Sequence, residues 1–134
     1  MGVNNDRLVA GQAIRREILG SDYVDRRAAT VWSFAEPFAE LMTEYAWGTI
    51  WARPGLSRRD RSLLNLGILA ALNRNDELTT HLAAAVTNGL ELAEIQEAIL
   101  QIALYCGAPA GVDALTCARK AFDLLGIDVE QEAP

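Results

Sequence analysis

Apolar residues recur every three or four positions along most of the chain, the spacing of amphipathic α-helices. The sustained apolar–polar alternation that indicates strands is missing from the sequence. We therefore expect an all-α bundle of about six helices, forming a single domain over residues 1–134 with a frayed acidic tail at 128–134. The approximate helix bounds are 5–19, 21–47 with a bend or restart at Pro37, 58–72, 76–88, 92–105 and 109–126.

The third predicted helix differs from the others because apolar or small residues occupy nearly every face from Leu63 onward. Ser57 is a suitable N-cap for it, with Asp60 three residues later in the capping-box position. A helix that is apolar all round is buried all round, so we expect it at the centre of the fold. A chain this short must cover its other apolar faces, which predicts a homo-oligomer.

Composition narrows the possible partners. A net charge of −6 and a pI near 4.7 argue against nucleic acid and anionic membrane surfaces. The longest apolar stretch, 63–72, is interrupted by Asn65 and Gly67 and is too short to span a bilayer. The N-terminal residues lack a secretory apolar region, so Cys106 and Cys117 are expected to be reduced thiols in a cytoplasmic protein. A single histidine argues against a histidine-based zinc site, and we expect no metal.

His81 is that histidine, and it lies one position off the apolar stripe of its helix. The short turn at 88–91 predicts that helices 76–88 and 92–105 are antiparallel neighbours. His81 and Glu97 then lie roughly 12 Å and roughly 8 Å from this turn, so their side chains can meet. A Glu partner would fix the imidazole tautomer and raise its pKa, which suits proton donation. The alternative is a boundary histidine with no catalytic role.

Polar residues form a stripe on the otherwise apolar helix 92–105, at Glu94, Glu97, Gln101 and Tyr105. The position of Glu94 favours exposure to solvent. Gln101 and Tyr105 continue the stripe further along the helix than a solvent-exposed face requires. Tyr105 and Cys106 end this helix where a pocket could open. A cysteine such as Cys106 is more often a small buried hydrophobe than a nucleophile.

Arg58, Arg59 and Arg61 cluster at the start of the third predicted helix. They are either solvated or a cationic site for a carboxylate, which arginine binds in bidentate fashion. Arg61 lies nearest the buried part of the helix and is the preferred ligand, with Arg58 as its helper. Trp47 and Trp51 either wall a pocket or fill a subunit interface, and the sequence leaves both possibilities open.

Several segments, taken in order, resemble the γ-carboxymuconolactone decarboxylase family. They are IRREILG at 14–20, YAWGTIWARPGL at 45–56, RSLL at 61–64, ALNR at 71–74, HL at 81–82, NG at 88–89, EIQE at 94–97 and YCGAPA at 105–110. The match spans nearly the whole chain, and the YAWG…W.RPGL block is specific to the decarboxylase branch.

The resemblance implies an all-α fold shared with the alkylhydroperoxidase AhpD, usually assembled as trimers or hexamers. It also implies a carboxy-lyase that removes CO2 from γ-carboxymuconolactone, a small anionic lactone, to give β-ketoadipate enol-lactone in the protocatechuate branch of the β-ketoadipate pathway. No cofactor is expected, because the released electrons delocalise into the lactone carbonyl of the substrate. Under this hypothesis the catalytic residues are His81, Glu97 and Cys106, and the substrate-binding residues are Arg61, Arg58, Trp47 and Tyr105.

The peroxidase branch of the superfamily carries a Glu, a CxxC pair and a His on one helix–turn–helix. At the matching positions this chain has Glu94, Cys106, Pro109 and Asp113, so a disulfide-based peroxide reduction lacks its second thiol. The decarboxylases tend to read Ala-Asn where this chain reads Gly-Val-Asp at 111–113. A paralogue acting on a related lactone or β-keto acid therefore stays open, as does a non-enzymatic oligomeric binding protein on the same fold.

Overall fold

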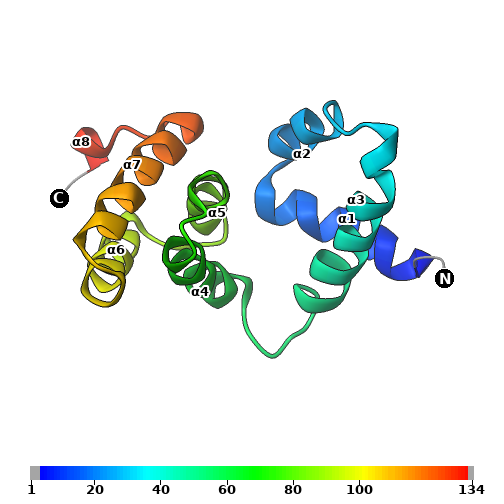
Figure 1. Cartoon of the computed structure of the whole chain (residues 1–134), viewed down its shortest axis with the longest axis horizontal. Coiled ribbons are helices and arrows are strands. Elements are labelled where there is room, and N and C mark those ends of the chain that lie inside the picture. The colour runs from blue at the N-terminus through cyan, green and yellow to red at the C-terminus, as the bar shows by residue number, and fades with distance from the viewer. Residues whose placement is uncertain (1–3, 133–134) are drawn as a thin grey trace. The chain divides into compact units, whose positions relative to one another are not determined.

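The computed structural model describes residues 4–132, whose regular secondary structure is entirely helical, with no strand among them (Figure 1). The all-α prediction is confirmed. The elements are α1 (Asn5–Leu19), α2 (Ser21–Ala28), the 3-10 turn η1 (Ser33–Ala35), α3 (Glu36–Met42), the π-helix η2 (Thr43–Ile50), α4 (Arg58–Ala71), α5 (Asn75–Thr87), α6 (Leu92–Cys106), α7 (Ala108–Leu125) and α8 (Val129–Glu132). Among these residues, none of the helices combines the length and apolar character that a membrane crossing demands.

The prediction of about six helices is wrong, because the segment expected as one helix over 21–47 is divided. Thr30 ends α2: its backbone N–H and its hydroxyl both donate to the Arg27 carbonyl, at 3.1 and 2.8 Å. Pro37 lies in the first turn of α3, where a missing N–H costs nothing, so it starts a helix instead of bending one. The spacing of apolar residues along the sequence does not reveal local hydrogen bonds of this kind.

The second departure is α8, which forms where a frayed tail was expected. The Asp128 carboxylate accepts a hydrogen bond from the Glu130 N–H at 3.1 Å, and the Asp128 carbonyl accepts from Gln131 N–H at 3.1 Å. An aspartate that satisfies free N–H groups at a helix start is a standard N-terminal cap. One capped turn therefore follows α7.

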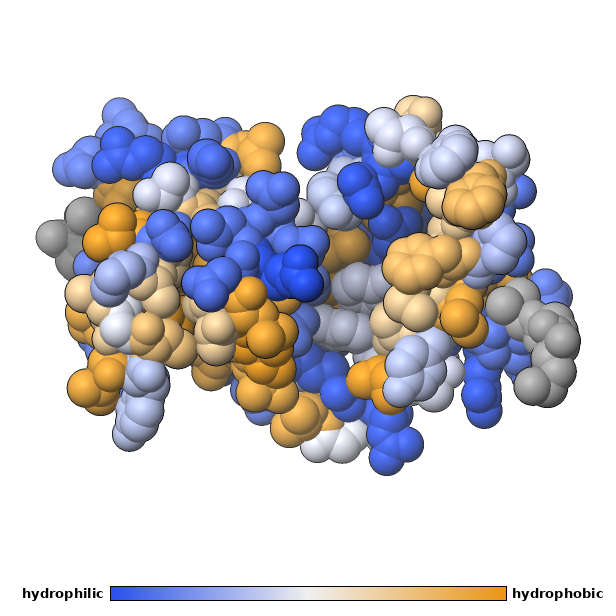
Figure 2. Space-filling view, in the orientation of Figure 1, coloured by the Kyte–Doolittle hydropathy of each residue, from blue (hydrophilic) through white to orange (hydrophobic). Residues whose placement is uncertain are grey.

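The described chain divides into two compact units, Met1–Arg58 and Arg59–Pro134, and each is described by itself. The single domain over 1–134 stays a prediction. Figure 2 shows apolar side chains at the surface of both units.

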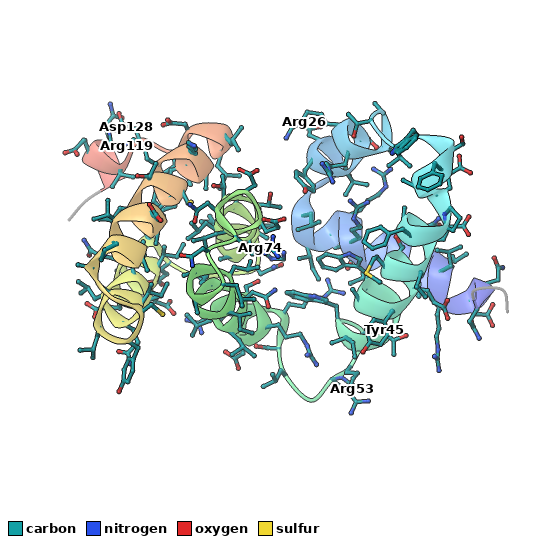
Figure 3. The ribbon with its side chains drawn as sticks, viewed as in Figure 1. Arg26, Tyr45, Arg53, Arg74, Arg119 and Asp128 are labelled. Carbon is teal, nitrogen blue, oxygen red and sulfur yellow. The ribbon has the colours of Figure 1, made fainter. Side chains whose placement is uncertain are left out.

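The N-terminal unit depends on a close approach of α1 to η2. A Cβ added to Gly11 would clash with the Thr43 carbonyl, and one added to Gly48 would clash with the Arg7 carbonyl. These two glycines let the backbones of the helices touch. Tyr45 lies on the exposed side of η2 (Figure 3).

The C-terminal unit has its core between α4, α5, α6 and α7, and α7 packs against both α5 and α6. The buried residues of this core are Leu66, Ala70, Leu78, Leu82, Ala85, Leu90, Ile95, Ile99, Ile102, Ala114, Cys117, Ala118 and Ala121. This core therefore buries one face of each of these four helices.

The expectation that α4 is buried on all sides is wrong. Its buried residues are Ser62, Leu66 and Ala70, which fall on one face, while Leu64 is 55% and Ile68 is 44% exposed. The sequence shows that a helix is apolar, but a single chain of this length has too few helices to cover every face of α4. The uncovered apolar surface is consistent with the expected oligomer.

We expect Gly48→Ala to lower the free energy of unfolding by about 1–3 kcal/mol, because the added methyl group would force η2 away from α1. Chemical denaturation followed by circular dichroism measures the change. Gly67→Ala is the matched control: its added Cβ would meet nothing within 4 Å, and alanine favours a helix. Equal losses in both variants would contradict the close α1–η2 contact.

Candidate active site

Two polar contacts join α4 to α5. The Asn88 side-chain amide donates to the Ser62 hydroxyl at 3.0 Å, and Ser62 is completely buried. One turn further along α4, Nδ2 of Asn65 lies 3.5 Å from Nδ1 of His81. The partners occur in the opposite order along α5, so the two helices are antiparallel and their register is fixed by these contacts.

The His81 ring is half-buried at this contact. Burial lowers the pKa of His81 from its ordinary 6.5, because the imidazolium loses hydration, and the negative charge of Glu77 one turn earlier on α5 opposes the shift only in part. The ring is therefore neutral at neutral pH. The expectation that Glu97 raises the pKa of His81 is wrong: the effect of burial exceeds the attraction of the carboxylate that acts on the ring.

Arg61 precedes Asn65 by four residues on α4, so the two side chains leave the same side of the helix. Arg61 is half-buried, and its Nε is shielded from solvent. We call Arg61, Asn65 and His81 the α4/α5 cluster. It combines a permanent cation with a neutral imidazole and an amide, and this combination suits an anionic ligand.

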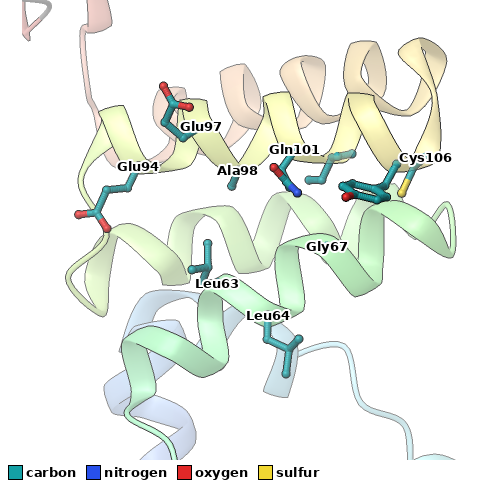
Figure 4. Close-up of a pocket in the computed structure, with 10 residues that line it drawn as sticks. Leu63, Leu64, Gly67, Glu94, Glu97, Ala98, Gln101 and Cys106 are labelled. Atoms are coloured by element: carbon teal, nitrogen blue, oxygen red, sulfur yellow. The ribbon is translucent and has the colours of Figure 1, made fainter.

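A groove of about 660 Å³ runs between α4 and α6 (Figure 4). It is lined by Leu63, Leu64, Gly67, Glu94, Glu97, Ala98, Gln101, Ile102, Tyr105 and Cys106. Figure 4 shows Leu63 and Gln101 pointing into the space between the two helices. The polar stripe predicted on α6 is thus brought together with Cys106. In the part of the chain that the structure describes, neither His81 nor Arg61 is among the lining residues.

The charge of this α4/α6 groove differs from that of the α4/α5 cluster. Glu94, expected to be solvated, forms an ion pair with Arg59, and Glu97 is exposed on the same helix. The remaining walls are mostly apolar. Uncompensated acidic charge disfavours an anionic ligand here. Cys106 is also exposed, and the buried small hydrophobe is Cys117 instead.

Two of the predicted site residues belong to the N-terminal unit and are described within it. Trp47 stacks on Trp51 with ring centroids 5.2 Å apart, and Trp51 is buried. Arg58 forms a 2.6 Å ion pair with Glu17. The pair gives the Arg58 guanidinium a carboxylate partner from its own unit.

The apolar pattern of the sequence does not identify Asn65, Ser62 and Asn88. Asn65 interrupts the apolar stretch 63–72, and its place on the helix face that carries Arg61 is the signal in the sequence that points to it. The departure at 111–113 also has a packing explanation. Gly111 is buried, and a Cβ there would lie 2.9 Å from Cβ of Ala103 on α6.

Fold and cluster together define a small all-α protein with a polar site between two antiparallel helices. No group of three or more His, Cys, Asp or Glu residues among positions 4–132 is arranged to hold a metal ion. Residues 36–120, which include the α4/α5 cluster and the groove, match the Carboxymuconolactone decarboxylase family.

Two curated relatives extend this match. A 4-carboxymuconolactone decarboxylase of Acinetobacter baylyi is 39% identical over 128 residues, which cover 96% of each chain. A nitrosuccinic acid decarboxylase, npaB, of Metarhizium robertsii is 43% identical over 110 residues, which cover 82% of this chain and 77% of that protein. The chain belongs to the carboxymuconolactone decarboxylase family. Both relatives are decarboxylases, and this chain is an enzyme of that class.

We expect the folded state to lose stability as the pH falls below about 6.5, the pKa of an unperturbed histidine. The pKa of His81 is depressed on folding, so its stabilising contribution is complete above 6.5 and is lost as the pH falls through the folded-state value. Urea denaturation at several pH values measures this slope, with His81→Gln as the control. A variant with the same slope as the wild type would contradict the assignment.

Proposed function

We propose that the protein catalyses cofactor-independent decarboxylation of γ-carboxymuconolactone to β-ketoadipate enol-lactone. The observation that carries the proposal is the similarity to a 4-carboxymuconolactone decarboxylase over 96% of each chain. The α4/α5 cluster supports it, because a cation beside a neutral hydrogen-bond donor suits a carboxylated lactone. As part of the proposal we place the reaction in the cytoplasm, where free thiols such as Cys106 and Cys117 persist.

The reaction breaks one carbon–carbon bond and releases CO2. The electron pair of that bond moves through the double bond of the substrate into the lactone carbonyl, which becomes a dienolate oxygen, and the α-carbon then takes up a proton from solvent water. The protein must hold the carboxylate and stabilise the new charge on oxygen. Donors placed where that charge develops are a large source of catalysis.

In the proposed mechanism Arg61 binds substrate carboxylate and His81 donates an N–H to the dienolate oxygen. A neutral imidazole can act as such an electrophile, and a lowered pKa keeps it neutral. The lowered pKa therefore changes the role proposed for His81 from proton donor to hydrogen-bond donor. Glu97, Tyr105 and Cys106 on the groove stay predictions as site residues, as do Arg58 and Trp47 in the N-terminal unit.

A second candidate substrate is nitrosuccinic acid, the compound named for the Metarhizium relative that is 43% identical. Its nitro group can accept the electron pair left by CO2, as the lactone carbonyl does in the first reaction. Both compounds join a carboxylate to an electron acceptor on the same small molecule. The same cation and the same N–H donor serve both reactions, so the two substrates must be compared directly.

We expect purified protein to release CO2 from γ-carboxymuconolactone, and His81→Gln to lower kcat by on the order of 100-fold, because the dienolate oxygen loses its donor. Gas-phase CO2 detection and loss of lactone absorbance measure the turnover. Arg61→Ala should raise KM, whereas Arg119→Ala, an exposed arginine on α7, should leave both constants unchanged.

Nitrosuccinate run in parallel separates the two substrates, and the higher kcat/KM identifies the preferred one. The pH profile of kcat/KM tests the charge state of His81: activity should fall as the pH drops below 6.5, since the neutral ring is the active form. A rate that instead rises as the pH falls would show that the imidazolium is required. Full activity in His81→Gln would remove His81 from the mechanism.

We also propose that the protein assembles as a trimer or hexamer. On α6, Leu100 and Leu104 lie one turn apart and are 59% and 73% exposed, beside the apolar α4/α6 groove. Contiguous exposed apolar surface of this kind marks an interaction site, and identical subunits are its simplest occupants.

We expect Leu104→Glu to reduce the assembly to smaller species, because a carboxylate would be buried in an apolar contact. Light scattering coupled to size-exclusion chromatography gives the mass. Gln96→Glu adds the same charge at an exposed polar position of α6 and should leave the mass unchanged. A monomeric wild type would contradict the proposal.

A further inference from the structure

Asn65 is a half-buried amide within the apolar stretch 63–72, and its Nδ2 faces Nδ1 of His81. The NH2 group that faces the ring can only donate, so this contact is satisfied when Nδ1 of His81 carries a lone pair. A neutral imidazole has one N–H and one lone pair, which leaves the proton on Nε2. The 3.5 Å separation is at the long end of the range for a hydrogen bond.

We propose that Asn65 is a positioning residue that holds His81 in the tautomer with its proton on Nε2. The inference rests on the proposed function, because the Nε2–H is the group that would meet the dienolate oxygen. With the opposite tautomer, a lone pair of the ring would face a developing negative charge, and the two would repel each other. Asn65 itself would touch only the ring.

The neighbouring contacts explain why this amide can hold the ring. Ser62 is completely buried and receives a hydrogen bond from Asn88, which fixes how α4 lies along α5. Asn65 follows Ser62 by one turn and is carried to His81 by that register. The carboxylate of Glu77 acts on the ring from α5 by its charge. The amide of Asn65, on α4, acts on the ring through the orientation of its N–H group.

The tautomer can be measured directly because the chain has one histidine, so every imidazole signal belongs to His81. In 15N-labelled protein we expect the Nδ1 signal of an unprotonated nitrogen and the Nε2 signal of a protonated one. Asn65→Ala should move both toward the averaged shifts of a tautomer mixture. Asn65→Asp should reverse them, because a carboxylate only accepts and draws the proton to Nδ1.

Gln96→Ala is the matched control, because it removes an amide at an exposed position of α6. It leaves the contacts between α4 and α5 in place, so the wild-type tautomer should persist. Asn65→Asp keeps the size of the side chain, so the test survives if Asn65→Ala does not fold. A wild-type ring protonated on Nδ1, or nitrogen shifts that do not change in Asn65→Asp, would overturn the proposal.

Turnover separates this inference from the proposed function. Asn65→Ala should lower kcat on the order of tenfold with KM nearly unchanged, less than the loss of the ring itself. If the tautomer responds to Asn65 but neither substrate releases CO2, the proposed function fails and the positioning role for the ring stands. If CO2 release requires His81 while the tautomer ignores Asn65, the positioning role alone fails.

Discussion

The C-terminal unit depends on one buried polar contact, the hydrogen bond from Asn88 to Ser62. A hydroxyl with no exposed surface must find a partner or bear the cost of lost hydration, so α4 can settle on α5 in few registers. Apolar packing alone would tolerate a shift along the helix. The contact therefore sets the register in which Asn65, one turn further along α4, lies beside His81. The candidate active site results from this register.

Charge then distinguishes the two places where a ligand could bind. The α4/α6 groove is mostly apolar, and its ionic groups are Glu94 and Glu97. The α4/α5 cluster offers the permanent charge of Arg61 beside an imidazole kept neutral by burial. If the proposed reaction, in which substrate and intermediate are both anions, is the one catalysed, the charge of the α4/α5 cluster suits it better than that of the groove.

The two relatives suggest why one cluster can serve different substrates. A carboxymuconolactone and nitrosuccinic acid share little in shape, yet each places an electron acceptor close to the departing carboxylate. An enzyme that supplies a cation and an N–H donor leaves the electron sink to the substrate. Selectivity must then come from other walls of the site.

The sequence by itself determined the class of fold, the position of most helices and the family. α1, α5, α6 and α7 begin and end close to where caps, glycines and Pro109 predicted them, because these are local interactions. The same residues could not show that Thr30 would end α2, or that α4 would be covered on one face only. The lowered pKa of His81 and the position of Asn65 beside its ring were decided by tertiary structure. The burial of a side chain and the direction of its hydrogen bonds depend on which residues two helices bring together. The periodicity of one helix carries no information about the helix packed beside it.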